Sequence, residues 1–248
     1  MILEGKRAFV TGGGTGIGAA IALHLADAGA EVVITGRREE PLKATAAKSE
    51  RISWATIDAS DEASIVEAIG AAGDIDIMVA NAGIADTSPV AKITMEHWRK
   101  VQATNVEGVM VCTREALRQM VPRGWGRVII ISSTSGLKGM RYIGAYSASK
   151  HAVLGLMKCA SEETLTTGVT VNAICPGYVM TELVASSIDN IVQKTGMTAE
   201  EATATLADVN PFKRLIETDE VAAAAMWLCG PGSGAITGQA VPVSGGQV

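Results

Sequence analysis

The chain has 248 residues, of which 48% are hydrophobic and 19% are charged, and its formal net charge is −5. A net negative charge provides no basic surface, so we expect no nucleic-acid partner. No stretch of about 18 consecutive apolar residues is present, and residues 1–6 run straight into the first apolar run, so we expect neither a membrane span nor a signal peptide. The four cysteines are widely spaced and the three histidines form no ligand pattern, which favours buried thiols in a reducing cytoplasm over disulfides or a metal site.

Apolar runs and helical patterns alternate along the whole chain, without internal repeats or a linker. Strands are expected at 7–11, 31–35, 51–57, 74–80, 127–132, 169–175 and 239–243. Helices are expected at 19–29, 101–120, 146–168, across the interrupted polar segment 182–213, and from 218 onward. This alternation predicts one α/β domain over 1–248, built on a doubly wound, mainly parallel sheet of seven strands with helices on both faces.

The first strand runs directly into a glycine-rich turn and then into a helix. Backbone N–H groups and a helix N-terminus meet in such a turn, where a pyrophosphate can sit. Gly14-x-Gly16-x-x-Ala19 fits the general dinucleotide fingerprint, and Thr11-Gly12-x-x-x-Gly16-Ile17-Gly18 is more particular. The turn therefore predicts a dinucleotide cofactor, held by Gly12, Gly14, Thr15, Gly16, Ile17 and Gly18.

A second group of polar residues follows the strand at 127–132. Ser133 stands at the end of that strand, where open α/β sheets place their ligands, and Tyr146 and Lys150 lie one helical turn apart. A nearby ammonium favours the phenolate and lowers the pKa of a tyrosine, and a serine hydroxyl stabilises charge on a substrate oxygen. The trio suits proton transfer at a hydroxyl carbon. Taken alone, the spacing of Tyr146 and Lys150 is common by chance and favours a packed aromatic and a solvated charge.

Together these motifs resemble the short-chain dehydrogenase/reductase family nearly end to end. The resemblance rests on the glycine turn, Asp58, Asn81-Ala82-Gly83, Asn105, Ser133, Tyr146-Ser147-Ala148-Ser149-Lys150 and Pro176-Gly177. Tyr146 follows Ser133 by thirteen positions, which equals the family spacing. The resemblance implies a single-domain Rossmann fold and an NAD(P)-dependent oxidoreductase of the classical type, closest to 3-oxoacyl and polyketide ketoreductases.

The resemblance also implies a role for each motif. Tyr146 would exchange the proton, Ser133 would polarise the substrate oxygen, and Lys150 would bind the nicotinamide ribose and lower the pKa of Tyr146. Asn105 would position a water between Lys150 and solvent, with a buried helix kink as the competing explanation. Asp58 would bind the adenine amino group, unless it is a helix N-cap. The remaining cofactor contacts would come from Asn81, Ala82, Gly83, Pro176, Gly177, Val179 and Thr181.

The strand at 31–35 bears on the choice of cofactor. An NAD-selective site carries an acidic residue at about this place, whereas here Gly36 is followed by Arg37 and Arg38. Arginine suits a 2′-phosphate because its planar fork makes charge-assisted, bidentate contacts. We therefore predict NADP(H), with NAD(H) as the alternative. The competing explanation is that the two arginines are loop charges balanced by Glu39 and Glu40.

The substrate is predicted more coarsely. By resemblance, a lid at about 182–213 and the residues Ser133, Tyr146, Met140, Tyr142, Ile143, Tyr178 and Ala85 would line the pocket. A 3-oxoacyl thioester or a polyketide-type ketone fits best, although Thr167 replaces the basic residue that docks a carrier protein. A phosphorylated coenzyme A tail could instead be held by Arg123, Arg127, Lys138 and Arg141, with a solvated group of surface charges as the competing explanation. The alternatives are a dehydrogenase of a small free secondary alcohol or hydroxy acid and, more remotely, a non-catalytic cofactor sensor.

The helix after Tyr146 carries small residues that permit close approach of another helix. In the family this helix packs against the same helix of a partner subunit, so the resemblance implies a homotetramer. The residues in question are Ala148, Ala152, Gly155 and Ala160.

Overall fold

Seven strands form one sheet in the order β3-β2-β1-β4-β5-β6-β7, and all the described pairings between neighbouring strands are parallel. The computed structural model describes residues 1–248, apart from the side chains of Leu183 and Ser186. The strands are β1 (Arg7–Thr11), β2 (Glu31–Gly36), β3 (Ile52–Thr56), β4 (Ile77–Ala80), β5 (Gly126–Ile131), β6 (Val169–Pro176) and β7 (Ala240–Val243). The predicted doubly wound α/β fold is confirmed.

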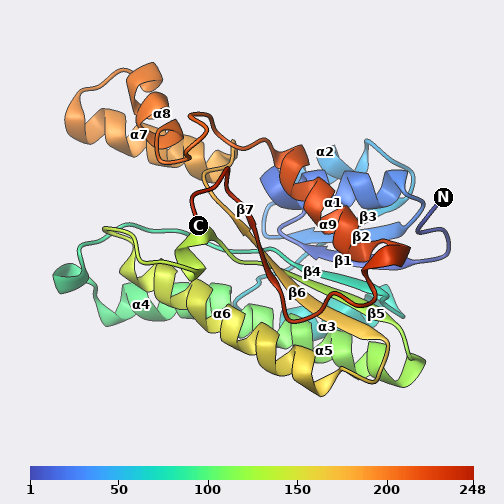
Figure 1. Cartoon of the computed structure of the whole chain (residues 1–248). Helices are drawn as coiled ribbons and strands as arrows, with labels where there is room; N and C mark the ends of the chain where they lie inside the picture. Colours follow the sequence, from blue (N-terminus) through green and yellow to red (C-terminus); the bar gives the residue numbers. More distant parts are fainter.

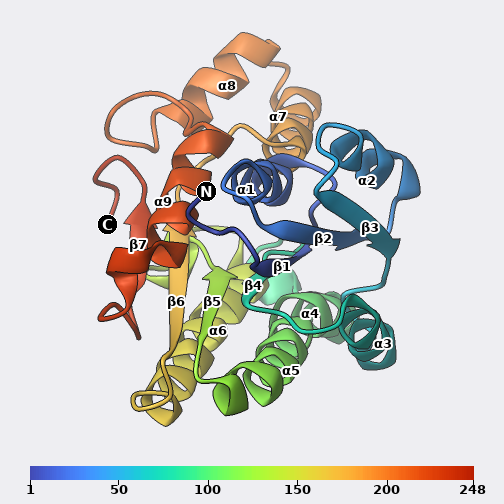
Figure 2. The same ribbon diagram turned by 90° about the vertical axis from the view of Figure 1, so that its right-hand side faces the viewer.

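Helices cover both faces of this sheet (Figure 1). Figure 2 shows α1 and α9 on one face and α3, α4, α5 and α6 on the other. The helices are α1 (Gly16–Asp27), α2 (Glu39–Ala46), α3 (Glu62–Ala72), α4 (Met95–Gln102), α5 (Gly108–Arg123), α6 (Gly144–Glu163), α7 (Glu182–Thr195), α8 (Ala199–Ala207) and α9 (Thr218–Cys229). None of the helices in the described part of the chain is long and apolar enough to cross a bilayer.

The central strands are almost completely apolar because both of their faces are buried. Successive side chains alternate between two clusters, as the pleat requires. One cluster lies against α1 and α9 and contains Val10, Ile34, Val79, Ile129 and Ile174. The other lies against α3, α5 and α6 and contains Phe9, Met78, Val128, Ile130 and Val171.

The observed elements differ from the predicted ones at a few boundaries. Helices α2, α3 and α4 are not among the predicted helices, and the strand expected from residue 74 begins only at Ile77. Helix α6 ends at Glu163 rather than near Gly168. At this point the Thr164 N–H bonds to the Ser161 carbonyl, three residues back, in place of the helical bond four residues back.

The segment expected to form a lid contains α7 and α8, which project from the body of the molecule (orange in Figure 1). A parallel bridge between Val179 and Ile216 joins the two ends of this excursion. Its interior is a small separate cluster that includes Val184, Leu206 and Leu215. The lid is therefore a unit with its own packing, attached at a narrow base.

Strand order reverses beside β1, which pairs with β2 on one side and with β4 on the other. In doubly wound sheets, ligands bind at the carboxyl ends of the strands beside such a switch point. The topology therefore places a binding crevice above β1, β4 and β5.

Candidate active site

A cavity of about 630 Å³ opens at this edge of the sheet. All the residues predicted to contact the cofactor line it except Gly18, namely Gly12, Gly14, Thr15, Gly16, Ile17, Arg37, Arg38, Asp58, Asn81, Ala82, Gly83, Tyr146, Lys150, Pro176, Gly177, Val179 and Thr181. Segments far apart in the sequence thus meet around one space whose volume is in the usual range for ligand pockets.

The glycine turn brings backbone to the cavity wall. Gly12 and Gly16 have φ values of +66° and +55°, which side chains strongly disfavour. The N-cap residue of α1, Thr15, makes no side-chain capping bond, so the first N–H groups of the helix are left for a ligand. Asn81 braces the turn, since its Nδ2 donates to the Thr11 carbonyl over 2.8 Å.

Gly18 has a different role from the one predicted. A Cβ at this position would lie 2.3 Å from the Gly12 carbonyl oxygen and 2.5 Å from Asn81 Nδ2. Gly18 does not line the cavity but lets α1 pack directly against the turn. The family motif thus combines positions that face the ligand with one that sets the packing.

Ser133, Tyr146 and Lys150 all line this cavity. Ser133 follows β5 and its Oγ accepts a 3.1 Å hydrogen bond from the Ser135 N–H, which starts a short helical turn. The Lys150 ammonium donates to the Ile131 carbonyl over 2.8 Å and lies 5.6 Å from the centroid of the Tyr146 ring. Helix α6 and the end of β5 therefore bring the predicted trio together.

Burial shifts the pKa values of Tyr146 and Lys150 in opposite directions. It raises the pKa of Tyr146 to about 12, and the interaction with Ser133 opposes this rise only in part. Burial also lowers the pKa of Lys150 to about 8. Loss of solvation is the largest cause of the shift, and the expected lowering of the tyrosine pKa by its lysine neighbour is not found in this arrangement. Tyr146 is a protonated phenol at neutral pH and can donate a proton.

Asn105 lies below the cavity wall and is completely buried. Its amide bonds to both backbone groups of Ile84, over 2.8 and 2.9 Å, and to Ser149 Oγ over 3.1 Å. It sits in a π-helical stretch, Ala103–Glu107, which joins α4 to α5. A Cβ on Gly83 would lie 3.3 Å from Asn105 Oδ1 and 3.6 Å from Lys150 Nζ, so both groups border the same small space. The helix distortion and a relay role are thus compatible, and the relay remains a prediction.

The two arginines after β2 are not balanced by the glutamates that follow them. Glu39 and Glu40 both pair with Lys43, at 2.7 and 3.5 Å. Arg37 is exposed at the cavity, where its charge helps to lower the pKa of Asp58. Arg38 forms a 2.6 Å ion pair with Glu182 at the start of the lid. The competing explanation, in which Glu39 and Glu40 balance Arg37 and Arg38, is therefore wrong about the partners of the two arginines.

Asp58 is not the cap of the following helix. Asp61 caps α3 by accepting from the Ala63 N–H, whereas Asp58 accepts from the N–H and hydroxyl of Ser60 over 2.9 and 2.7 Å. These bonds are the main reason why the pKa of Asp58 is lowered. Asp58 is therefore an ionised acceptor at the cavity wall, and its binding of the adenine amino group stays a prediction.

The substrate residues are only partly assembled at this cavity. Met140, Tyr142 and Tyr178 are absent from its lining. Tyr142 is 60% exposed and Tyr178 packs against the hydrophobic cluster of the lid. The lining also includes Ile84 and Thr104, which the sequence reasoning missed, and Val184, which lies in the segment expected to form the lid. Ile84 and Thr104 are direct neighbours of Gly83 and Asn105, and that adjacency was the only available signal.

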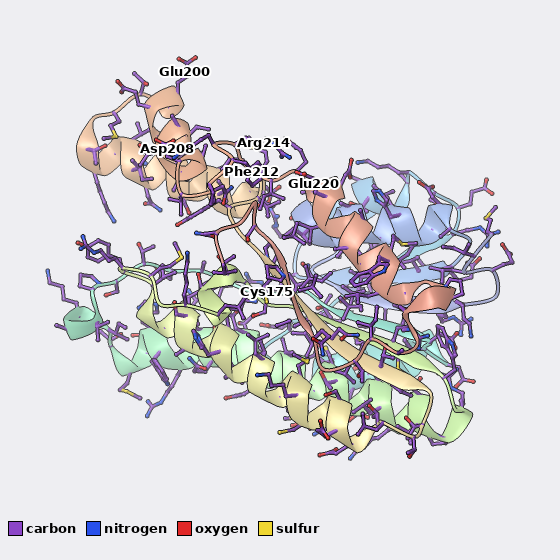
Figure 3. All side chains as sticks on the ribbon, in the orientation of Figure 1. Cys175, Glu200, Asp208, Phe212, Arg214 and Glu220 are labelled. Carbon is purple, nitrogen blue, oxygen red and sulfur yellow. The ribbon has the colours of Figure 1, made fainter. Side chains whose placement is uncertain are left out.

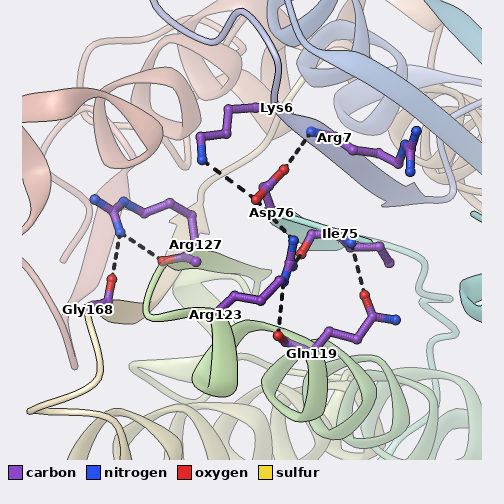
Figure 4. A network of polar contacts seen from close by, with 9 residues as sticks. Lys6, Arg7, Ile75, Asp76, Gln119, Arg123, Arg127 and Gly168 are labelled. Carbon is purple, nitrogen blue, oxygen red and sulfur yellow. Dashed lines mark hydrogen bonds and ion pairs between the residues drawn. The ribbon is translucent and has the colours of Figure 1, made fainter. Parts of the chain in front are cut away.

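Two of the cations expected to hold a coenzyme A tail lie elsewhere. Arg123 and Arg127 belong to a polar network at the amino-terminal edge of the sheet (Figure 4). Arg127 is 4% exposed and donates to the Gly126 and Gly168 carbonyls. This part of the prediction is wrong, because neither residue faces the edge that carries the cavity.

Known proteins resemble this chain over its full length. The family described as short chain dehydrogenase matches residues 6–192. An acetoacetyl-CoA reductase from Rhizobium meliloti (strain 1021) is 36% identical over 98% of each chain. A D-beta-hydroxybutyrate dehydrogenase from Cupriavidus necator is 35% identical over 100% of this chain and 99% of that protein. The crystal structure of an actinorhodin polyketide ketoreductase variant with NADPH superposes with a TM-score of 0.94 and 35% identity, covering 98% of this chain and 97% of the other.

The chain belongs to the short-chain dehydrogenase family and is an oxidoreductase.

Proposed function

We propose that the chain is an NADP(H)-dependent reductase that interconverts a ketone and a secondary alcohol, with 3-oxoacyl thioesters or related ketones as substrates. The observation that carries this proposal is the meeting of Ser133, Tyr146 and Lys150 with the glycine turn around one cavity. The relatives named acetoacetyl-CoA reductase and polyketide ketoreductase support the substrate class. A non-catalytic sensor is not favoured, since the complete set of catalytic residue types is retained.

When bound, NADPH supplies the hydride that reduces the ketone carbon. Tyr146 donates its proton to the ketone oxygen, and its raised pKa keeps that proton in place at neutral pH until the oxygen becomes basic. The Ser133 hydroxyl donates a hydrogen bond to the same oxygen and stabilises the charge that develops there. Lys150, with a pKa of about 8, holds the cofactor ribose and returns a proton to Tyr146, with Asn105 linking it to solvent.

The choice of NADP(H) is supported by Arg37 and Arg38. Both line the cavity beside Gly36, where an NAD-selective site would carry an acidic residue. Neither pairs with Glu39 or Glu40 in the described contacts, so both remain suited to a 2′-phosphate. The NADPH complex of the polyketide ketoreductase supports the same choice. NAD(H) is the alternative.

A small free hydroxy acid is the second candidate substrate. The 35% identical D-beta-hydroxybutyrate dehydrogenase favours it. Of the four cations predicted to hold the tail of a coenzyme A thioester, only Lys138 and Arg141 lie in the segment between β5 and α6. Lys138 already donates to the Gln247 carbonyl over 2.8 Å. A long phosphorylated tail would therefore have fewer cationic contacts than the sequence predicted.

We also propose a cytoplasmic homotetramer that binds no nucleic acid. The supporting feature is α6, on which Ala152 and Gly155 are exposed and a Cβ at Gly155 would meet no atom within 4 Å. Ala160 is buried in its own subunit and does not belong to this face. Measurement of the molar mass in solution tests the assembly, and a monomer at micromolar concentration would overturn it.

The decisive experiment compares Tyr146→Phe with wild type in acetoacetyl-CoA reduction by NADPH. We expect kcat to fall about 1,000-fold or more, within the range for general acid catalysis, while the Kd of NADPH changes little. Tyr142→Phe, at an exposed tyrosine just before α6, is the matched control and should keep its activity. Running 3-hydroxybutyrate oxidation and NADH in parallel separates the two substrate classes and the two cofactors. Near-normal turnover of Tyr146→Phe would refute the mechanism.

A further inference from the structure

The two ends of the lid are held in different ways. At its carboxyl end, Arg214 makes a bidentate ion pair with Glu220 of α9, over 2.6 and 2.7 Å, and its guanidinium lies 4.4 Å from the centroid of the Phe212 ring. Figure 3 shows this group between α8 and α9. The pairing lowers the pKa of Glu220 to about 2. None of these residues lines the cavity, so this end of the lid is attached to the helical framework.

The amino end of the lid is attached to the cofactor-binding half instead. Glu182 is the first residue of α7, and its Oε2 lies 2.6 Å from Arg38 Nη2 at the end of β2. Both side chains line the cavity, and both are about 60% exposed. The Arg38–Glu182 ion pair therefore links the lid directly to one of the two arginines that are suited to the cofactor phosphate.

A 2′-phosphate and the Glu182 carboxylate require the same partner. A guanidinium binds a phosphate through two parallel charge-assisted bonds, and the phosphate carries more negative charge than a carboxylate. Exposed ion pairs such as Arg38–Glu182 are individually weak. Arg37 lies on the same rim, and its positive charge adds to the attraction for a phosphate. The phosphate should therefore displace the carboxylate from Arg38.

We propose that Glu182 is a specificity-determining residue that competes with the 2′-phosphate of NADP(H) for Arg38, so that binding of this cofactor releases the first turn of the lid. The inference rests on the proposed cofactor but not on any substrate. NADH carries a hydroxyl in place of the phosphate and leaves the ion pair intact. The adjacent residue Thr181, which caps α7 and is expected at the nicotinamide end, moves with that first turn.

The test is a fluorescence titration of the full chain with NADPH and with NADH. In Glu182→Gln we expect the Kd of NADPH to fall about three- to tenfold, because the competitor is removed, and the Kd of NADH to stay within twofold. Glu200→Gln, an exposed carboxylate on α8 away from the cavity, is the matched control and should change neither value. In an Arg38→Gln background the gain from Glu182→Gln should disappear.

Two results would overturn the inference. An equal change for both cofactors would mean that Glu182 acts on the dinucleotide as a whole. A gain that persists in the Arg38→Gln background would mean that Glu182 only repels the phosphate. Hydrogen exchange gives an independent readout, since NADPH but not NADH should increase exchange at 182–186. Binding needs no turnover, so these results stand apart from the Tyr146→Phe test of the proposed reaction.

Discussion

The two edges of the sheet use charged residues in opposite ways. At the amino-terminal edge, Asp76 accepts from the Arg7 N–H over 3.0 Å and pairs with Lys6 and Arg123 at 3.6 and 3.4 Å (Figure 4). The Lys6 ammonium also lies 3.8 Å from the centroid of the Trp125 ring. At the carboxyl edge, Lys150 is 3% exposed and pairs with no carboxylate in the described salt bridges; it bonds only to the Ile131 carbonyl.

The charged residues at the amino-terminal edge stabilise the fold, whereas Lys150 at the carboxyl edge serves the chemistry. A buried charge with an opposite partner and several hydrogen bonds holds its surroundings in place. A buried cation without an anion is costly, and its pKa shifts toward the neutral form. The fold therefore carries an energetic penalty at Lys150 and obtains there an amine whose pKa, about 8, is close to the working pH.

The largest expected effect comes from Lys150→Met. Turnover should fall by about 100-fold or more, because the ribose contact and the proton supply to Tyr146 are both lost. Thermal stability at pH 7 should not fall, since the variant removes a buried cation. Steady-state kinetics and a thermal melt on the same preparation measure both quantities.

The lowered pKa of Lys150 also predicts how the stability of the wild type relative to Lys150→Met changes with pH. The pKa of Lys150 is lowered from 10.5 to about 8 in the folded state, so between these values the unfolded chain binds more protons. The stability of the wild type relative to Lys150→Met should therefore rise as the pH goes from 8 toward 10.5, and be lowest below pH 8. A variant that is less stable at pH 7 would show that Lys150 is a structural residue like those at the other edge.

The next largest effect is expected where α1 packs against the glycine turn. Gly18→Ala places a methyl group 2.3 Å from the Gly12 carbonyl oxygen, and backbone cannot move away as a flexible side chain can. We expect a loss of about 3 kcal/mol in stability, the upper part of the range for overpacking, together with weaker NADPH binding. Gly70→Ala in α3, where a Cβ meets nothing within 4 Å, is the matched control. Unchanged cofactor affinity in Gly18→Ala would mean that the turn adapts without help from α1.

Gly18 also illustrates how far the sequence could lead. Every strand was located because each is a largely apolar run between turns. The glycine turn and the catalytic residues were found because their spacing is local. The same pattern cannot tell a glycine that faces a ligand from one that admits a neighbouring helix. That distinction depends on the distance between α1 and Asn81, which are far apart in the sequence.

Charges were harder to place than apolar residues. Arg127 looked like a surface cation for a coenzyme A tail, yet it is buried at the amino-terminal edge of the sheet. Its place as the first residue of the expected strand already indicated that edge, whereas its burial depends on the packing of the whole fold. Likewise, the pairing of Arg38 with Glu182 spans 144 positions, and no local pattern predicts it. The sign of the Tyr146 pKa shift was missed for a related reason, since burial depends on the whole fold.

The smallest effect is expected from Asp76→Asn. The amide keeps one acceptor for the Arg7 N–H but leaves Lys6 and Arg123 without their carboxylate, so we expect a loss of about 1–2 kcal/mol in stability. Denaturant unfolding measures it, and Glu39→Gln, which removes an exposed helical pair with Lys43, should cost less. The kcat/KM of the folded enzyme should be unchanged, because this edge contributes no group to the cavity. If Asp76→Asn instead lowered kcat/KM without lowering stability, the charges at this edge would act on the active site through the sheet, and the two edges could not be assigned separate roles.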